Sequence, residues 1–249
     1  MEKIVLQKFI ADSGLCSRRK AEQMIRDGRV KVDEKLAELG MKVNEKNKVE
    51  VDGQKLNSDK KLIYIKLNKP VGYTCTNREF KNEKNIFNLV KVEERLFAVG
   101  RLDKDSHGLV LLTNDGELTN KLTHPRYGHE KEYVAQVTSN PPMPTAGRAS
   151  KLQITRILGE LKKGIDVGEG DGIAKVQDIK YLGNNKFKVV LAQGKKRQLR
   201  RMFKAVDCDV VDLLRVRIGD IELGDLEEGA WEEIKYADNT QIINADLRG

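Results

Sequence analysis

The first stretch of the chain alternates between helical and strand-like spacing of apolar residues. An apolar stripe at helical spacing comes first, made by Leu6, Phe9 and Ile10. After a polar break, Ser17 is a suitable N-cap for a second helix over residues 18–27, and Gly28 suits its C-terminal end. Residues 29–32 then alternate as a half-buried strand does. These patterns predict a small helix–helix–strand module at the start of the chain.

The rest of the chain mixes strand-like and helical runs without a regular strand–helix–strand rhythm. The apolar patterns predict strands at 62–65, 96–99, 109–112, 130–137 and 186–191. They predict helices at 117–122, 152–161 and 197–206. Polar residues at 57–61 indicate a linker, and the prolines of 140–144 indicate a loop. We therefore expect an α+β fold, with a mixed and mainly antiparallel sheet in the second part.

Composition narrows the class of protein. No run approaches the roughly 18 consecutive apolar residues of a membrane helix, and the N-terminus lacks the apolar stretch of a signal peptide. A cytoplasmic protein is expected. The three cysteines are odd in number and far apart, and the three histidines show no ligand spacing with them, which favours reduced thiols and no metal. The glycines of 164–172 lack the Lys-Ser/Thr ending of a phosphate-binding P-loop.

The formal net charge of +8 matters through its distribution. Arg18, Arg19 and Lys20 open the second helix, where cations oppose the helix dipole. Free backbone N–H groups at the same end favour phosphate, so the three cations are candidate phosphate ligands. The alternative is an ordinary solvated face. A second basic cluster follows the strand at 186–191 and lies at the start of the helix at 197–206.

One acid stands out. Asp103 ends the sequence Gly-Arg-Leu-Asp at 100–103 and lies between two apolar runs. A carboxylate in such surroundings needs an ion-pair partner or has a chemical role. The helix at 197–206 packs apolar residues inward and offers Arg197 and Arg200 at a rim. An arginine fork is the natural partner of a partly buried carboxylate. Asp105 is interpreted as a loop residue that faces solvent or caps a turn.

Three blocks in this order resemble the RsuA/RluB/RluE/RluF family of ribosomal RNA pseudouridine synthases. The blocks are Gly-Arg-Leu-Asp at 100–103, a tyrosine on a following strand at Tyr133, and Gly-Lys-Lys-Arg-Gln-Leu-Arg-Arg-Met at 194–202. The resemblance implies that Asp103 is the catalytic aspartate, that Tyr133 stacks on the target base, and that Arg200, or else Arg197, pairs with Asp103. It also implies RNA contacts for other cations: Lys69, Arg101, Arg197 and Arg201.

The N-terminal module resembles the S4-like RNA-binding domain over about 45 residues. That resemblance implies RNA-backbone contacts for five cations: Arg18, Arg19, Lys20, Arg29 and Lys31. We expect an S4-like domain at residues 1–58 and a pseudouridine synthase domain at 62–249. The linker separates the two.

The family reaction breaks the bond between uracil nitrogen 1 and ribose and rejoins the base through carbon 5. It needs no cofactor and no metal. The predicted substrate is a structured stem-loop of 23S ribosomal RNA near the peptidyl transferase centre, because residues 129–133 and 100–106 look most like RluF-type enzymes. A 16S target, as in the RsuA branch, is the alternative within the class. A non-catalytic ribosome-associated RNA-binding protein is the alternative outside it. A monomer is expected because no heptad pattern is present.

Overall fold

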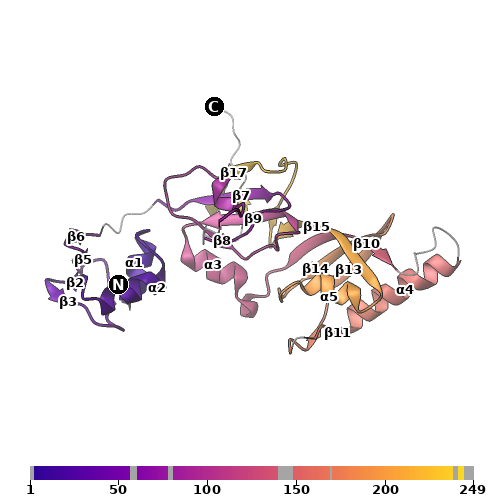
Figure 1. The fold of residues 1–249 in the computed structure, drawn as a ribbon, viewed down its shortest axis with the longest axis horizontal. Helices are drawn as coiled ribbons and strands as arrows, with labels where there is room; N and C mark the ends of the chain where they lie inside the picture. Colours follow the sequence, from indigo (N-terminus) through magenta and orange to yellow (C-terminus); the bar gives the residue numbers. More distant parts are fainter. Residues whose placement is uncertain are drawn as a thin grey trace. The chain divides into compact units, whose positions relative to one another are not determined.

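The computed structural model describes residues 3–56, 61–77, 81–139, 148–168, 170–237 and 241–243 (Figure 1). Residues 57–60 of the predicted linker and the whole predicted loop at 140–144 lie outside this part of the chain. The chain divides into two compact units. One contains the residues up to Ile63 together with 92–97 and 113–116, and the other contains the remainder. Each unit is described separately below.

The N-terminal unit packs two helices against short strands. The strands are β1 (Ile4–Val5), β2 (Val30–Val32), β3 (Lys35–Leu36), β4 (Lys42–Val43), β5 (Val49–Val51) and β6 (Gln54–Lys55). Strand β1 pairs with β4, and the other four form a sheet in the order β3-β2-β5-β6. The helices are α1 (Leu6–Asp12) and α2 (Arg18–Arg26). Leu6 and Ile10 of α1 and Ala21 of α2 are fully buried in the shared core. The two helices that the apolar spacing predicts are therefore present, and their apolar faces form the core of this unit.

Helix α2 begins and ends where its sequence signals predict. The Ser17 side chain accepts a hydrogen bond from the Lys20 backbone N–H at 3.2 Å, which satisfies one donor of the first turn. Gly28 follows the helix with a φ of +69°, a left-handed conformation that glycine adopts without strain. Strand β2 follows, and in it Lys31 is exposed whereas Val30 and Val32 are buried.

The second unit is built on a nine-stranded sheet. Its main path is β13-β14-β10-β15-β9-β7-β17, while β16 pairs with β15 and β8 pairs with β9. The bounds are β7 (Tyr64–Lys69), β8 (Phe97–Val99), β9 (His107–Thr113), β10 (Lys131–Ser139), β13 (Asp178–Gly183), β14 (Lys186–Leu191), β15 (Cys208–Ile218), β16 (Ile221–Glu222) and β17 (Trp231–Glu233). The pair β15–β9 is parallel, whereas β10 is antiparallel to both β14 and β15.

Three helices and several short elements complete this unit. The helices are α3 (Gly116–Thr123), α4 (Arg148–Lys163) and α5 (Gln198–Lys204), with 3-10 turns η1 (Ile86–Asn88) and η2 (Pro125–Tyr127). Short hairpins are β11 (Ile165–Asp166) with β12 (Ile173–Ala174), and β18 (Lys235–Ala237) with β19 (Gln241–Ile243). Figure 1 shows α4 and α5 beside β13 and β14. The ring of Phe203 on α5 lies 5.4 Å from that of Phe187 on β14, and both side chains are fully buried.

Glycine allows β9 and β15 to approach closely at one position. Gly108 has a φ of +100°, and a Cβ there would lie 2.4 Å from the carbonyl oxygen of Arg215. Only a residue without a side chain fits this contact. The pairing matters because β9 follows the segment that carries Asp103, whereas β15 carries Arg215.

The α+β fold expected from the sequence is confirmed. Strand β14 has the predicted bounds, and the bounds of α3, β8, β9, β10 and α5 differ from the predicted ones by at most two residues. Strand β7 begins two residues later than predicted and continues through Lys69. Strand β15, which lies between β10 and β9, was not predicted from the sequence.

Candidate active site

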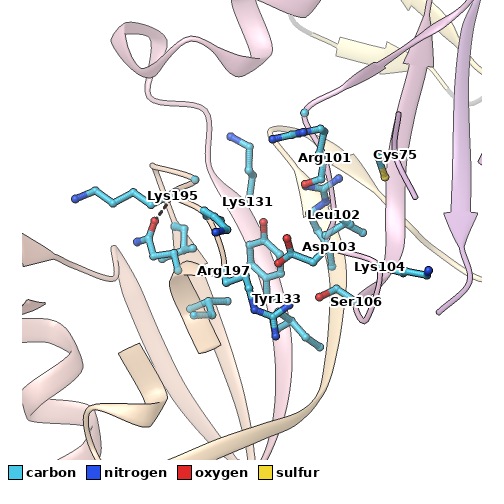
Figure 2. Close-up of a pocket in the computed structure, with 18 of the residues that line it drawn as sticks. Cys75, Arg101, Leu102, Asp103, Lys104, Ser106, Lys131, Tyr133, Lys195 and Arg197 are labelled. Carbon is cyan, nitrogen blue, oxygen red and sulfur yellow. Dashed lines mark hydrogen bonds between the residues drawn. The ribbon is translucent and has the colours of Figure 1, made fainter. Parts of the chain in front are cut away.

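A cavity of about 890 Å³ lies in the second unit, lined by parts of the chain that are far apart in sequence. It brings together the segment after β8, the start of β10, the end of β14 with the turn that follows it, and the middle of β15. Figure 2 shows the labelled side chains Asp103, Tyr133 and Arg101 around it. All three blocks that the sequence singled out thus contribute side chains to one cavity.

Asp103 lies in a turn between β8 and β9. Its carbonyl accepts a hydrogen bond from the Ser106 backbone N–H at 3.1 Å, and the Gly72 N–H donates to the carbonyl of Lys104 at 2.7 Å. These bonds fix the turn, and the half-buried Asp103 side chain lines the cavity. Among the described residues, none forms an ion pair or a hydrogen bond with its carboxylate. The carboxylate is therefore available to a ligand.

Tyr133 lies on β10 and is 8% exposed. Its cross-strand neighbours are Val189 on β14 and Arg215 on β15, so the tyrosine stands in the middle of three paired strands. Figure 2 shows its ring next to the Asp103 side chain. An aromatic ring in this setting offers a flat apolar surface on which a nucleobase can stack.

Arg197, which immediately precedes α5, and Arg200 of α5 contact Asp105, not Asp103. Arg197 donates from Nη1 and Nη2 to the two Asp105 carboxylate oxygens at 2.9 and 2.8 Å. The Arg200 Nε lies 3.3 Å from the same carboxylate, and its Nη2 donates to the Asp105 carbonyl at 2.8 Å. The hydrogen bonds from Arg197 hold the pKa of the Asp105 carboxyl below its ordinary value.

This geometry corrects the expectation that Arg200, or else Arg197, pairs with Asp103. Asp105 is an exposed loop residue, as expected, but its carboxylate also forms an ion pair with Arg197, which the sequence did not indicate. The Asp105 side chain is 45% exposed, so an ion pair there costs less desolvation than one inside the cavity. Arg200 has a further anchor in the Val210 carbonyl at 2.7 Å, which holds its guanidinium beside the loop.

Lys69 is completely buried, which corrects the expectation that it meets RNA phosphates. Its Nζ donates to the carbonyl of Ser106 at 2.6 Å and to that of Pro70 at 3.0 Å. Burial lowers the pKa of this ammonium. Because β7 extends through Lys69, the side chain enters the interior and supports the loop that carries Asp103.

The remaining predicted RNA contacts of this unit differ in availability. Arg101 is exposed and lines the cavity (Figure 2). Arg201 is mostly buried; its guanidinium forms an ion pair with Asp171 and donates to the Val167 carbonyl at 3.1 Å. That contact corrects the expectation of a free arginine for phosphate, since Asp171 already neutralises it.

In the N-terminal unit, the predicted RNA-binding cations lie on the surface. Arg18, Arg19 and Lys20 are exposed in the first turn of α2, and Lys31 is exposed on β2. Arg29 is exposed as well, but its Nε donates to the Asp52 carboxylate at 2.8 Å. All five cations are thus exposed, and one of them, Arg29, is paired with an acid.

Two further cations that line the cavity, Lys131 and Arg215, were not predicted from the sequence. Lys131 precedes Tyr133 by two residues on the same face of β10, which is the signal that could have found it. Arg215 lies on β15, where residues rich in valine and leucine would have indicated a strand. It is 1% exposed and donates from Nε to the Leu109 carbonyl at 2.7 Å.

Within the described parts of the chain, no three His, Cys, Asp or Glu side chains are placed to hold a metal ion. None of the described helices has the length and apolarity that a membrane crossing requires.

A carboxylate next to a buried tyrosine, in a cavity lined by cations, is suited to an enzyme that works on a nucleotide of a polyanionic chain. Comparison with known proteins gives the family. Residues 63–205 match the family of RNA pseudouridylate synthases, and residues 6–49 match the S4 domain. The chain belongs to the RNA pseudouridylate synthase family and carries an N-terminal S4 domain. Its class of reaction is therefore an isomerisation in RNA.

Relatives match nearly the whole chain. An RNA pseudouridine synthase of Aquifex aeolicus is 39% identical over 98% of this chain and 96% of its own length. The ribosomal large subunit pseudouridine synthase B of Bacillus subtilis is 37% identical over 92% of this chain and 91% of its own. The dual-specificity RNA pseudouridine synthase RluF of Escherichia coli is 35% identical over 92% and 74%. The crystal structure of a pseudouridylate synthase aligns with a TM-score of 0.64 at 26% identity, over 93% of this chain and 96% of the other.

Proposed function

We propose that this enzyme converts one specific uridine of 23S ribosomal RNA into pseudouridine, with Asp103 as the catalytic carboxylate. The observation that carries the proposal is the cavity in which the Asp103 carboxylate is unpaired among the described residues and lies next to Tyr133. The large-subunit target is supported by the relative in Bacillus subtilis, which is a ribosomal large subunit pseudouridine synthase. A stem-loop near the peptidyl transferase centre is the proposed substrate.

The target uridine has to leave its stack to reach Asp103, which costs a few kcal/mol. Stacking on Tyr133 offsets part of this cost. The bond between uracil N1 and ribose C1′ then breaks, with Asp103 acting either as a nucleophile at the sugar or as a base that removes a ribose proton. The base turns and forms a new bond from its C5 to C1′. The C5 proton is lost and N1 is protonated, so the product is an isomer and no redox partner is needed.

We propose a division of the chain into an S4-like domain at 1–58 and a catalytic domain at 62–249. The exposed cations at the start of α2 would contact RNA backbone, together with Lys31 and Arg101. Arg197 and Arg200 would act by holding the loop that carries Asp103, because both contact Asp105.

Pseudouridine mapping of both ribosomal RNAs tests the proposal. Cells that lack the protein would be complemented with the wild type, Asp103→Asn or Asp209→Asn. Asp209 is a matched control, because it is an exposed carboxylate in an ion pair with Lys204 and does not line the cavity. The expected result is one 23S site that the wild type and Asp209→Asn restore and Asp103→Asn does not.

Other outcomes contradict parts of the proposal. Restoration by Asp103→Asn would refute the role of Asp103. A restored site in 16S ribosomal RNA would keep the reaction and refute the large-subunit target. No site in either RNA, with ribosomal RNA binding retained, would indicate a binding protein without catalysis.

A further inference from the structure

Two cations in the cavity have no part in the chemistry described above. Lys131 lies at the start of β10, and Arg215 lies on the neighbouring strand β15, opposite Tyr133. Both side chains line the cavity that also contains Asp103 (Figure 2, where Lys131 is labelled). Lys131 is half-buried, and Arg215 is almost completely buried. A charged group is placed in such surroundings at a cost, so each needs a partner.

The hydrogen bonds of Arg215 are incomplete. Its Nε donates to the Leu109 carbonyl, and its Nη1 lies 3.4 Å from the Arg101 carbonyl. Its Nη2 is buried and finds no acceptor among the described residues. A guanidinium carries five N–H donors in a fixed plane, and leaving a buried donor unsatisfied costs about 1–3 kcal/mol. The free donor therefore marks a place for an acceptor that the described residues do not supply.

The charges of the two cations are also uncompensated. Within the described residues, neither Lys131 nor Arg215 forms an ion pair with an acid, although Asp103 and Glu83 line the same cavity. The Lys131 Nζ donates to the His129 carbonyl at 3.2 Å. Burial, followed by the positive charge of Arg215, lowers the pKa of Lys131. Two like charges in one poorly solvated cavity favour an anionic ligand over a neutral one.

We propose that Lys131 and Arg215 form a binding site for a phosphodiester group next to the extruded uridine. The inference rests on the proposed function, since phosphate is the anion that an RNA strand carries. A phosphate oxygen would accept the free Arg215 Nη2 donor and neutralise both cations. Gripping the backbone there would hold the nucleotide while Tyr133 contacts the base and Asp103 reaches the sugar. A uracil carbonyl would satisfy the donor but leave the charges uncompensated.

The test removes the negative charge of one phosphate in the RNA and, separately, the positive charge of Lys131 in the protein. The probe is a synthetic RNA that contains the uridine found by mapping, and two copies that carry one neutral methylphosphonate linkage, 5′ or 3′ of it. Binding is measured with the wild type, Lys131→Met and the control Lys180→Met. Lys180 is an exposed lysine of β13 that does not line the cavity. Arg215 hydrogen-bonds backbone carbonyls, so Lys131 carries the test in case an Arg215 variant fails to fold.

For the wild type, one of the two methylphosphonate copies should bind about tenfold more weakly than the intact RNA. Lys131→Met should bind the intact RNA more weakly than the wild type does by a similar factor. Its affinity should fall by less than about twofold further on the methylphosphonate copy that weakens wild-type binding, because the same contact cannot be lost twice. Its plot of log affinity against log salt should be shallower by about 0.7. Lys180→Met should respond as the wild type does.

Three results would overturn the inference. The first is that neither methylphosphonate copy binds the wild type more weakly than the intact RNA does. The second is that the loss of affinity from Lys131→Met and the loss from the methylphosphonate multiply. The third is that a 4-thiouridine copy weakens binding where the methylphosphonate copies do not, which points to a base carbonyl. Turnover of intact RNA by the wild type separates the two proposals. Without product the proposed function fails, whereas product with an unchanged phosphonate response refutes this site alone.

Discussion

Replacing Asp105 by asparagine should remove the ion pairs that join α5 to the loop carrying Asp103. Arg197 would lose two hydrogen bonds to a carboxylate, and the Arg200 Nε would lose its charged neighbour. Both Arg197 and Asp105 are more than 40% exposed, so solvent screens most of the attraction. Arg200 keeps its bonds to two backbone carbonyls. The expected loss of stability is about 1 kcal/mol at neutral pH, or about 2–4 °C in Tm.

The sign of the pH dependence follows from the lowered pKa of the Asp105 carboxyl. In the unfolded chain this group titrates near its ordinary value of 3.8, and in the folded chain it titrates below that. Its contribution to stability is therefore complete above the ordinary value and is lost as the pH falls through the folded value. The difference between the wild type and Asp105→Asn should be full at pH 7 and should shrink below about pH 4.

Urea unfolding followed by fluorescence measures this difference. The chain has one tryptophan, Trp231, and it lies on β17 in the same unit as the ion pairs. Asp209→Asn is the control, because Lys204 and Asp209 form a pair that is at least 60% exposed and should contribute close to nothing. An Asp105→Asn protein no less stable than the control would refute the reasoning, and so would a difference that stays constant down to pH 3.

Three further substitutions test the packing and the helix stability of the second unit. Phe187→Ala should cost about 3–5 kcal/mol in the urea-derived free energy of unfolding, because the ring is fully buried against Phe203; a loss under about 1 kcal/mol would contradict this packing. Gly108→Ala should cost at least about 2 kcal/mol, since its Cβ would meet the Arg215 carbonyl; an unchanged midpoint would be incompatible with the β9–β15 contact. Gly159→Ala should stabilise the protein by about 0.5–1 kcal/mol, because nothing lies within 4 Å of the new Cβ inside α4; a measured loss would contradict it.

Local signals carried most of the secondary structure. Ser17 and Gly28 flank α2 because capping depends on neighbours in sequence, which a sequence displays directly. The run at 186–191 became β14 without change, since it is rich in β-branched and apolar residues, of which Phe187, Val189, Val190 and Leu191 are buried. The sequence also singled out Asp103, through its position between two apolar runs and the resemblance of the Gly-Arg-Leu-Asp block; its side chain lines the cavity, and its catalytic role stays a proposal.

Properties set by long-range contacts were not predictable. The buried Arg215 interrupts the apolar pattern of β15, and nothing near it in the sequence indicates that β9 and β10 will cover it. Lysine is usually a surface residue, yet Lys69 is buried because β7 extends through it into the interior, where two backbone carbonyls accept hydrogen bonds from its ammonium group. Both cases are polar groups whose partners lie far away in sequence, so spacing alone gives no warning of them.

Arg197 and Arg200 pair with Asp105 and not with Asp103, which the sequence could not indicate and which suits the catalytic role proposed for Asp103. The two carboxylates lie two residues apart, and the arginine fork could satisfy either. Pairing with Asp103 would fill its carboxylate oxygens, and a substrate would have to break that ion pair before reacting. Pairing with Asp105 anchors the loop to α5 through Arg197 and Arg200 while the Asp103 oxygens stay accessible from the cavity. A rigid loop with an uncommitted carboxylate is what positioning a reactive group requires.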